Sequence, residues 1–362
     1  MGKLAKTVDW IDLVLLLVVG AFGLFILLSI DQSLFTQQLV ILVLAILAGI
    51  AVSMVDTAIV LWAAPLGYVA SLALLATSYL GPAIRGATRW IIVGGIQLQP
   101  SELVKPLLLL AFAWAMKVFP PRTMRGFLIQ CALFLPPFLL VLRQPDLGTS
   151  IVYSVMWLAM LVAAGFPLRY VITGLLVIFL LLPVGWRGLR DYQRSRIATF
   201  LDPGVDPKGA GYNAIQAMIA VGSGQWFGRG LGRGTQSHLR FLPEYHTDFI
   251  FATLVEELGF VGGFILLVAY GALLWRILRP LVAGVLVSVV PFVYSAGLLT
   301  MMLTQVVINA GMNMGLVPIT GITLPLVSYG GSSLLSLSVS YGILWALRRG
   351  EQDGGRAVAM GL

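Results

Sequence analysis

The sequence predicts an all-α, polytopic integral membrane protein with about ten transmembrane helices and one large extracytoplasmic loop. Of its 362 residues, 59% are hydrophobic and only 10% are charged, and the mean hydropathy of +0.96 lies far above that of soluble domains. A helix needs about 20 apolar residues to cross a hydrocarbon core. Ten apolar runs of about this length lie near residues 10–30, 38–55, 57–80, 102–118, 126–143, 147–165, 168–185, 249–275, 281–306 and 332–347.

Positive charges set the expected orientation of these runs. Lys3 and Lys6 precede a first apolar run that is too long for a signal-peptide core of about 7 to 15 residues. We therefore expect an uncleaved first helix that starts in the cytoplasm. Ten crossings then place both termini in the cytoplasm, with Arg348 and Arg349 inside and the uncharged connection 307–331 outside.

We expect a single membrane domain over residues 1–362, without a separate soluble domain. The longest connection, 186–248, is the large extracytoplasmic loop, and its segment 211–224 has the apolar spacing of a short amphipathic helix on the outer surface. The outer connection 307–331 contains two prolines and many glycines in an apolar stretch. Broken backbone of this kind is tolerated at membrane depth only beside protein or water, so this connection is either a re-entrant loop bordering a ligand cavity or a plain outer loop.

The formal net charge of +8 does not indicate a nucleic-acid partner, because inside-facing Lys and Arg at helix ends supply about half of it. The positive residues expected outside are more informative, since they predict an anionic ligand. They are Arg85, Arg89, Arg143 and a group in the long loop that includes Arg196. A solvated loop, or contact with anionic membrane lipids, explains the same charges equally well.

Cysteine and histidine usage excludes several kinds of site. The single cysteine, Cys131, lies in an apolar run, so an intramolecular disulfide cannot form. The sequence has no CxxC, HExxH or Walker motif, and His238 and His246 are not spaced as metal ligands. A nucleotide-driven pump is therefore disfavoured and no metal site is predicted, although dependence on a divalent cation stays open.

Two opposite charges open the fourth apolar run. The segment SELVK places Glu102 and Lys105 three residues apart on one helical face, which predicts an ion pair inside the bundle. With Ser101 as the helix N-cap and Glu102 near the positive end of the helix, this pair has a purely structural explanation. The functional alternative is that the pair lines a polar cavity in which Lys105 meets a phosphate.

Asp248 is the outer carboxylate with the most informative position, because it lies where the long polar loop enters a strongly apolar run. An ionisable group at the membrane rim is costly and usually functional, but an aspartate before FIFATL also suits a helix N-cap. Asp146, beside Arg143, is a second outer carboxylate. Polar residues that we expect near a bound ligand are Glu244, His246, Asn309, Asn313, Thr320, Thr323, Ser328 and Ser332.

Four sequence blocks carry a resemblance to a known family. They are WIIVGGIQLQPSELVK (90–105), RQPDLGTS (143–150), GTQSHLRFLPEYHTDFIFATLVEELG (234–259) and GLVPITGITLPLVSYGGSS (315–333). Together they resemble the SEDS family (shape, elongation, division and sporulation), in the same order and spread over most of the chain. The wording GTQSHLRFLPE before HTDF is more similar to the RodA (elongation) branch than to the FtsW (division) branch.

The resemblance implies a ten-helix glycosyltransferase of the bacterial cytoplasmic membrane that polymerises lipid II into peptidoglycan on the outer face. Lipid II is an undecaprenyl pyrophosphate that carries a disaccharide pentapeptide. Asp248 matches the family's essential aspartate, which makes it the expected general base, while Lys105 and the outer arginines could stabilise the departing pyrophosphate. The resemblance also implies partners: a class B penicillin-binding protein, which is a transpeptidase, and other machinery for cell elongation and cell shape.

Two other functions stay open from the sequence. A lipid II flippase would use the same cavity and charges without needing a base. A noncatalytic scaffold would use its helices only to hold a transpeptidase. Formation of glycan polymer from labelled lipid II in detergent distinguishes an enzyme, because flipping requires a sealed vesicle.

Overall fold

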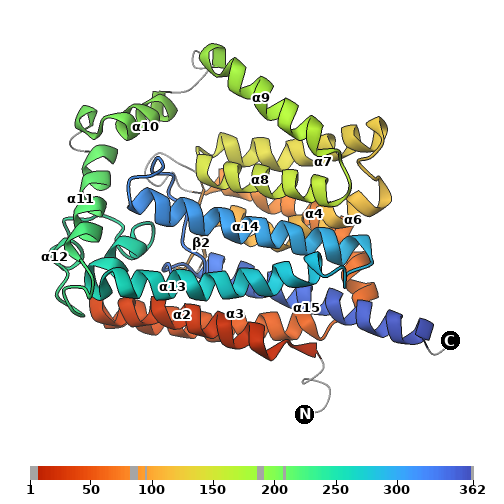
Figure 1. Cartoon of the computed structure of the whole chain (residues 1–362), viewed down its shortest axis with the longest axis horizontal. Coiled ribbons are helices and arrows are strands. Elements are labelled where there is room, and N and C mark those ends of the chain that lie inside the picture. The colour runs from red at the N-terminus through yellow and green to blue at the C-terminus, as the bar shows by residue number, and fades with distance from the viewer. Residues whose placement is uncertain (1–6, 82–88, 94–95, 186–190, 207–208, 360–362) are drawn as a thin grey trace.

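The computed structural model describes residues 7–81, 89–93, 96–185, 191–206 and 209–359. Long helices run side by side in one bundle (Figure 1). The N- and C-terminal parts of the chain lie at one end of this bundle, and the helices of the large loop lie at the opposite end (Figure 1). We call these the terminal end and the loop end.

The ten predicted apolar runs all coincide with helices. These are α2 (Trp10–Ile30), α3 (Gln32–Ser53), α4 (Thr57–Thr77), α5 (Pro100–Leu103) with α6 (Lys105–Val118), α7 (Met124–Arg143), α8 (Leu147–Ala163), α9 (Leu168–Gly185), α13 (Ile250–Val282), α14 (Val289–Asn313) and α15 (Gly331–Ala359). Six of them, α2, α3, α4, α7, α13 and α14, are long and apolar enough to cross a membrane. The helical membrane fold is confirmed.

Aspartate caps explain where several helices begin. Asp9, Asp31, Asp56 and Asp146 precede α2, α3, α4 and α8, and each carboxylate accepts hydrogen bonds from backbone N–H groups of its helix. The prediction that the second run starts at residue 38 was wrong, because the cap at Asp31 starts the helix earlier. Polar residues of this extra turn and a half form hydrogen bonds within the protein, as Gln37 does by accepting from the Tyr329 hydroxyl at 2.6 Å.

The predicted connection 307–331 is shorter in the structure, because α14 continues to Asn313. Asn309 and Asn313 are therefore helical, and both are fully buried. The remaining segment is the loop 314–330, which returns the chain to α15. The predicted start of the connection at residue 307 was wrong. The helix α14 continues beyond this residue because its polar side chains find hydrogen-bond partners inside the bundle.

The helix α13 is interrupted near the loop end. Gly259 has φ +72°, a left-handed conformation that glycine adopts without steric cost. The backbone N–H groups that follow the break do not lose their partners, since Phe260 donates to the carbonyl of Gln225 at 2.7 Å and Val261 donates to that of Trp226 at 3.1 Å. A segment of the large loop is thereby fixed against the break.

Within its described residues, the large loop contains α10 (Asp191–Leu201), the 3-10 turn η3 (Pro203–Val205), α11 (Ala210–Ser223) and α12 (Thr235–His238). The predicted amphipathic helix over 211–224 is confirmed as α11. Its small residues Ala217 and Ala220 are fully buried, whereas Met218 and Ile219 are exposed. The small side chains let α11 pack closely, and its larger apolar side chains face outward.

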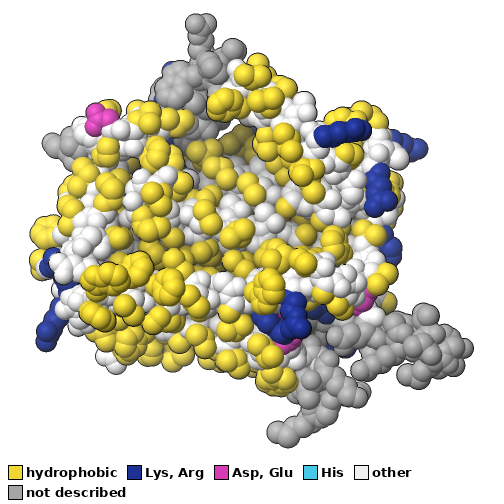
Figure 2. All heavy atoms as spheres, in the orientation of Figure 1, with side chains coloured by type: hydrophobic (Ala, Val, Ile, Leu, Met, Phe, Trp, Pro, Cys, Tyr) yellow, Lys and Arg dark blue, Asp and Glu magenta, His cyan; other side chains and the backbone are white. Residues whose placement is uncertain are grey.

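A short antiparallel hairpin, β1 (Ile91–Val93) with β2 (Ile96–Leu98), was not anticipated. It does not change the fold class, but it delivers the chain to the start of α5. Hydrophobic side chains cover the middle of the bundle on the face in Figure 2, with Lys and Arg toward its margins. This distribution fits a protein whose middle is surrounded by lipid.

Candidate active site

Asp248 lies between α12 and α13 at the loop end and is half-buried. The expectation that it forms the helix N-cap was wrong, because Phe249 occupies the N-cap position of α13. Helix geometry at this position therefore gives no N-cap reason for a carboxylate at residue 248.

The backbone just before Asp248 is held by the loop 314–330. The carbonyl of His246 accepts a hydrogen bond from the backbone N–H of Tyr329 at 2.9 Å. The carbonyl of Thr247 accepts one from Ser328 Oγ at 2.7 Å, and the same hydroxyl accepts from the N–H of Leu324 at 2.7 Å. Ser328, a predicted ligand-binding residue, thus links the loop to the segment that carries Asp248.

Two buried asparagines of α14 hold Asp248 itself. Its carbonyl accepts from Asn309 Nδ2 at 3.0 Å and from Asn313 Nδ2 at 3.1 Å. Asn309 also donates to the carbonyl of Ile322 at 2.7 Å, and Asn313 Oδ1 accepts from the N–H of Ala252 at 3.1 Å. The two amides therefore connect α14, the start of α13 and the loop 314–330.

The loop passes directly against the Asp248 carboxylate. Gly321 has φ +74°, and a Cβ placed on it would lie 3.3 Å from Asp248 Oδ2. On the other side, a Cβ on Gly148 in α8 would lie 3.0 Å from the carbonyl oxygen of Thr320. The backbone at 320–321 consequently fits between Asp248 and the start of α8.

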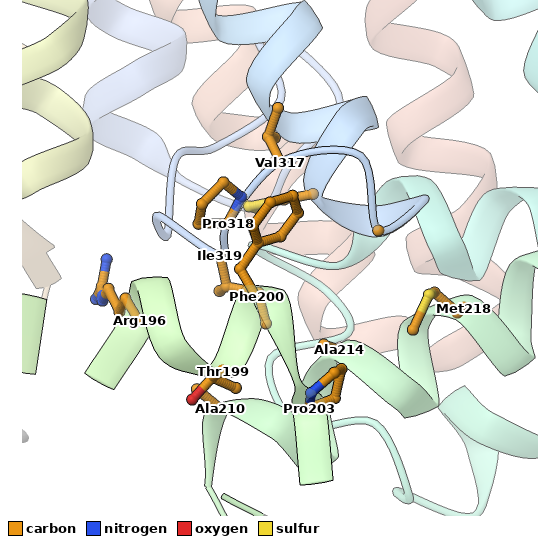
Figure 3. Close-up of a pocket in the computed structure, with 12 residues that line it drawn as sticks. Arg196, Thr199, Phe200, Pro203, Ala210, Ala214, Met218, Val317, Pro318 and Ile319 are labelled. Carbon is orange, nitrogen blue, oxygen red and sulfur yellow. The ribbon is translucent and has the colours of Figure 1, made fainter. Parts of the chain in front are cut away.

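Arg196 reaches the same turn of the loop from α10. Its Nη1 donates to the carbonyl of Thr320 at 3.2 Å, one residue before Gly321. Arg196 also lines a mostly apolar pocket between α10, α11 and the loop, with an empty volume of about 410 Å³ that is partly open to solvent (Figure 3). Phe200 points from α10 toward Pro318 and its neighbours in this pocket (Figure 3).

A second group of polar side chains lies where α5, α8 and α15 begin. Asp146 is buried and accepts from Thr149 N at 3.0 Å, Thr149 Oγ1 at 2.9 Å and Gln99 Nε2 at 3.1 Å. The backbone N–H of Gln99 donates to Ser332 Oγ at 2.9 Å. Asp146 therefore turns into the bundle, away from Arg143, which is exposed at the end of α7.

The predicted ion pair between Glu102 and Lys105 is present. Lys105 Nζ lies 2.5 Å from Glu102 Oε1, and both side chains are buried. Ser101 is not the N-cap as expected, because Gln99 takes that position and Pro100 begins α5. The two charges lie on either side of Val104, where α5 ends and α6 begins.

The remaining predicted site residues lie in different environments. Arg85 lies outside the described residues. Arg89 is half-buried, and its buried Nε finds no hydrogen-bond partner within the described part of the chain. Glu244 is half-buried, with Oε2 accepting from Thr247 Oγ1 at 3.1 Å. The ring of His246 makes edge contacts with Tyr245 and Tyr329.

Gln99 is a polar residue at the site that we did not single out from the sequence. Its position directly before a proline that starts a helix is the signal that could have found it. Over the described ranges, no group of three or more His, Cys, Asp or Glu side chains is arranged to hold a metal ion.

Comparison with known proteins identifies the family of the chain. A family model described as "Cell cycle protein", which covers FtsW, RodA and SpoVE, matches residues 6–353. The chain belongs to the FtsW/RodA/SpoVE family. This is the SEDS family that the sequence blocks resemble, so the resemblance is confirmed.

Individual members of the FtsW/RodA/SpoVE family are similar over most of the chain. "Peptidoglycan glycosyltransferase MrdB" of Escherichia coli (strain K12) is 41% identical over 290 residues, which cover 79% of this chain and 77% of that protein. A chain from a peptidoglycan synthase complex that coordinates polymerization and crosslinking matches with a TM-score of 0.83 and 33% identity, covering 95% of this chain and 98% of the other. The rod shape determining protein RodA of Thermus thermophilus matches with a TM-score of 0.71 and 31% identity, covering 94% and 96%.

Proposed function

We infer that this chain is a peptidoglycan glycosyltransferase of the RodA type that polymerises lipid II, and we propose that Asp248 is its general base. The enzyme class is supported by a relative of that name at 41% identity and by similarity to a solved RodA along nearly the whole chain. The name of that solved protein supports a role in rod shape, which is the elongation function expected from the sequence.

The proposed role of Asp248 as a base rests on one observation. The backbone at 320–321 contacts both the carboxylate of Asp248 and the guanidinium of Arg196. Gly321 lies against Asp248 Oδ2, and the preceding carbonyl, of Thr320, accepts a hydrogen bond from Arg196. Glycosyl transfer from a pyrophosphate needs both kinds of group. A base must accept a proton from the attacking hydroxyl, and a cation must offset the charge that develops on the leaving group.

The proposed reaction proceeds in one displacement. The Asp248 carboxylate accepts the proton of the acceptor sugar hydroxyl as the hydroxyl oxygen attacks the anomeric carbon of the donor. The bond from this carbon to the pyrophosphate oxygen breaks, and undecaprenyl pyrophosphate leaves with the electron pair. Attack from the face opposite the leaving group inverts the anomeric centre.

The cations are not equivalent candidates for binding the pyrophosphate. Lys105 is offset by Glu102 at 2.5 Å, so the pair adds little net charge to its surroundings. Arg89 has a buried Nε without a partner among the described residues, and Arg196 borders the turn beside Asp248. We propose Arg196 and Arg89 as the principal pyrophosphate ligands, with Lys105 as a supporting charge. Substrate contacts by Arg85 and Arg143 stay predictions from the sequence.

The proposed orientation places the loop end outside the cell, and the proposed partner is a class B penicillin-binding protein. The partner is supported by the 33% identical chain, which comes from a complex that both polymerises and crosslinks peptidoglycan. The glycines Gly262 and Gly263 on α13, which the sequence suggested as a contact for a partner helix, add no support, because both are buried within this chain.

The test is the Asp248→Asn variant, assayed for polymer formation from labelled lipid II in detergent. Loss of the proton acceptor should lower turnover by about 10² to 10⁴, while the melting temperature and lipid II binding stay unchanged. The matched control is Asp202→Asn, which changes an exposed aspartate of the same loop. Wild-type polymerisation by a folded Asp248→Asn protein would return Asp248 to a structural role.

The flippase alternative predicts a different result in the same assay. A flippase yields no polymer in detergent, whichever residue occupies position 248. Polymer formed by the wild-type chain, and lost only in Asp248→Asn, supports the enzyme and excludes a purely scaffolding role.

A further inference from the structure

A second cavity lies at the terminal end of the bundle, which is the end opposite Asp248. It has an empty volume of about 990 Å³, part of it open to solvent. Side chains from the start of α2, the end of α13, the connection between α13 and α14, and α15 line it, and they include Arg276, Arg279 and Arg348. The proposed glycosyl transfer does not use this cavity.

Most charges beside the cavity already have partners within the protein. Asp12 is fully buried and accepts from Arg276 Nε at 2.8 Å, Arg348 Nη1 at 3.4 Å and Trp345 Nε1 at 3.2 Å. Arg276 also pairs with Asp9, which caps α2. This network ties α2, α13 and α15 together.

The third carboxylate at the cavity is engaged as well. Oε1 of Glu351 accepts from the backbone N–H groups of Val287 at 2.8 Å and Ser288 at 2.9 Å. The carboxylates around the cavity are therefore engaged by Arg276, Arg348, Trp345 or backbone N–H groups. What remains to face a ligand is a set of donors.

Two guanidinium groups retain unused donors. Arg279 is exposed at the end of α13, and its guanidinium group makes no hydrogen bond or ion pair with any residue that the structure describes. Arg348 lines the cavity, and its Nη1 and Nη2 each donate once within the protein, to Asp12 and to the carbonyl of Arg276, which leaves a second N–H on each nitrogen. Guanidinium donors of this kind match the oxygens of a phosphate group.

Val285 lines the cavity, and further exposed apolar side chains lie close in sequence to other lining residues. Val282, Val285 and Val287 are 74%, 61% and 86% exposed on and after the end of α13. Trp10 and Trp275, at the corresponding level of α2 and α13, are also exposed, as is common for tryptophan at a membrane interface. A ligand here meets cations inside the cavity and an apolar rim outside it.

We propose that this cavity binds the phosphate headgroup of an anionic phospholipid from the membrane leaflet at the terminal end. The phosphate contacts Arg279 and Arg348, and the acyl chains lie over the valine rim and the lipid-facing side of α13. A basic pocket between membrane helices is a recognised kind of headgroup site. A headgroup without an ammonium group fits best, because the nearby carboxylates are already engaged.

The experiment measures lipid retention by the purified full chain in detergent, using native mass spectrometry. The probes are dioleoylphosphatidylglycerol, dioleoylphosphatidylcholine and inorganic phosphate. We expect one phosphatidylglycerol to be retained in preference to phosphatidylcholine, and millimolar phosphate not to displace it. Equal retention of the two lipids overturns the anionic specificity, and full displacement by phosphate overturns the lipid assignment in favour of a soluble anion.

Two variants locate the site. Arg279→Ala removes an exposed cation outside the buried ion network, and it should weaken phosphatidylglycerol binding about fivefold. Val285→Glu adds a carboxylate at the rim and should weaken binding similarly, whereas Val285→Lys should strengthen it. The control is Arg125→Ala, an exposed arginine in the first turn of α7, which begins at the terminal end (Figure 1). Equal binding by Arg279→Ala and Arg125→Ala places the lipid elsewhere and overturns the proposal.

Discussion

Glu102 and Lys105 show how strongly single residues depend on each other inside this bundle. Their side chains are 8% and 2% exposed and lie 2.5 Å apart. Replacing one of them, as in Glu102→Gln, leaves an uncompensated buried charge and should cost about 3 to 5 kcal/mol of stability. The double variant Glu102→Gln with Lys105→Met should recover much of that loss. Thermal unfolding in detergent measures both; a double variant as unstable as the worse single variant would contradict the pairing.

Gly321 combines a backbone requirement with a position beside Asp248. Gly321→Ala should destabilise the protein by about 1 to 3 kcal/mol, because a side chain is strained at φ +74°. It should also lower turnover by at least about tenfold, because the new methyl group would lie 3.3 Å from Asp248 Oδ2.

Gly284 provides a matched control for Gly321. Its φ is +66°, but it lies in the connection after α13, and a Cβ there would meet nothing within 4 Å. Gly284→Ala should therefore show a similar loss of melting temperature with nearly normal polymerisation. Equal turnover in the two variants would mean that Gly321 matters only for folding.

At the scale of elements, α14 positions the segment that carries Asp248. Asn309 and Asn313 both donate to its carbonyl, so Asn313→Leu leaves a buried acceptor with one bond fewer and loosens the junction. We expect turnover to fall by about 10 to 10², since a small displacement of the proposed base is costly. The measurement is the rate of polymer formation at saturating lipid II.

A double-variant comparison separates positioning from general destabilisation. If Asn313 acts through Asp248, then Asn313→Leu should cause no further loss of turnover in an Asp248→Asn background. An independent structural defect would instead multiply the two losses. The melting temperatures of the single variants show how much of the effect comes from folding.

The elements themselves were largely predictable, whereas their junctions were not. Apolar runs are local signals, and aspartates such as Asp31 mark helix starts within the same stretch of chain. The break at Gly259 and the length of α14 depend on partners distant in sequence, namely the carbonyls of Gln225 and Trp226 and that of Asp248. The sequence pattern of one segment therefore does not predict these hydrogen bonds, because the partners lie elsewhere in the chain.

The site was predictable to a similar extent. Membrane-edge position identifies Asp248, and helical spacing identifies the pair of Glu102 and Lys105, because both signals are local. The inward turn of Asp146 toward Gln99 follows only from the packing of α5 against α8 and α15. Arg196 likewise meets Thr320 through the fold of the large loop.

At the scale of the whole molecule, the chemistry is divided between the two ends of the bundle. The loop end holds Asp248, Arg196 and the loop 314–330, and the terminal end holds the ion network around Asp12 (Figure 1). The helix α7 begins and α13 ends at the terminal end (Figure 1), and the exposed Arg125 and Arg279 lie in these helix ends. The positive-inside rule counts short connections, and not a long loop such as the one with the exposed Arg229, Arg233 and Arg240, so the arginines of the terminal end predict that this end faces the cytoplasm.

Cysteine labelling tests this orientation. In a Cys131→Ala background, Val205→Cys lies at the loop end and Val287→Cys at the terminal end, and both valines are well exposed, at 63% and 86%. An impermeant maleimide should label position 205 in intact spheroplasts and position 287 only after permeabilisation, because the bundle separates the two sites. Polymerisation by each variant serves as the control for folding. Labelling of position 287 in intact spheroplasts would invert the orientation, and it would place the Asp248 site in the cytoplasm, away from the proposed outer face of synthesis.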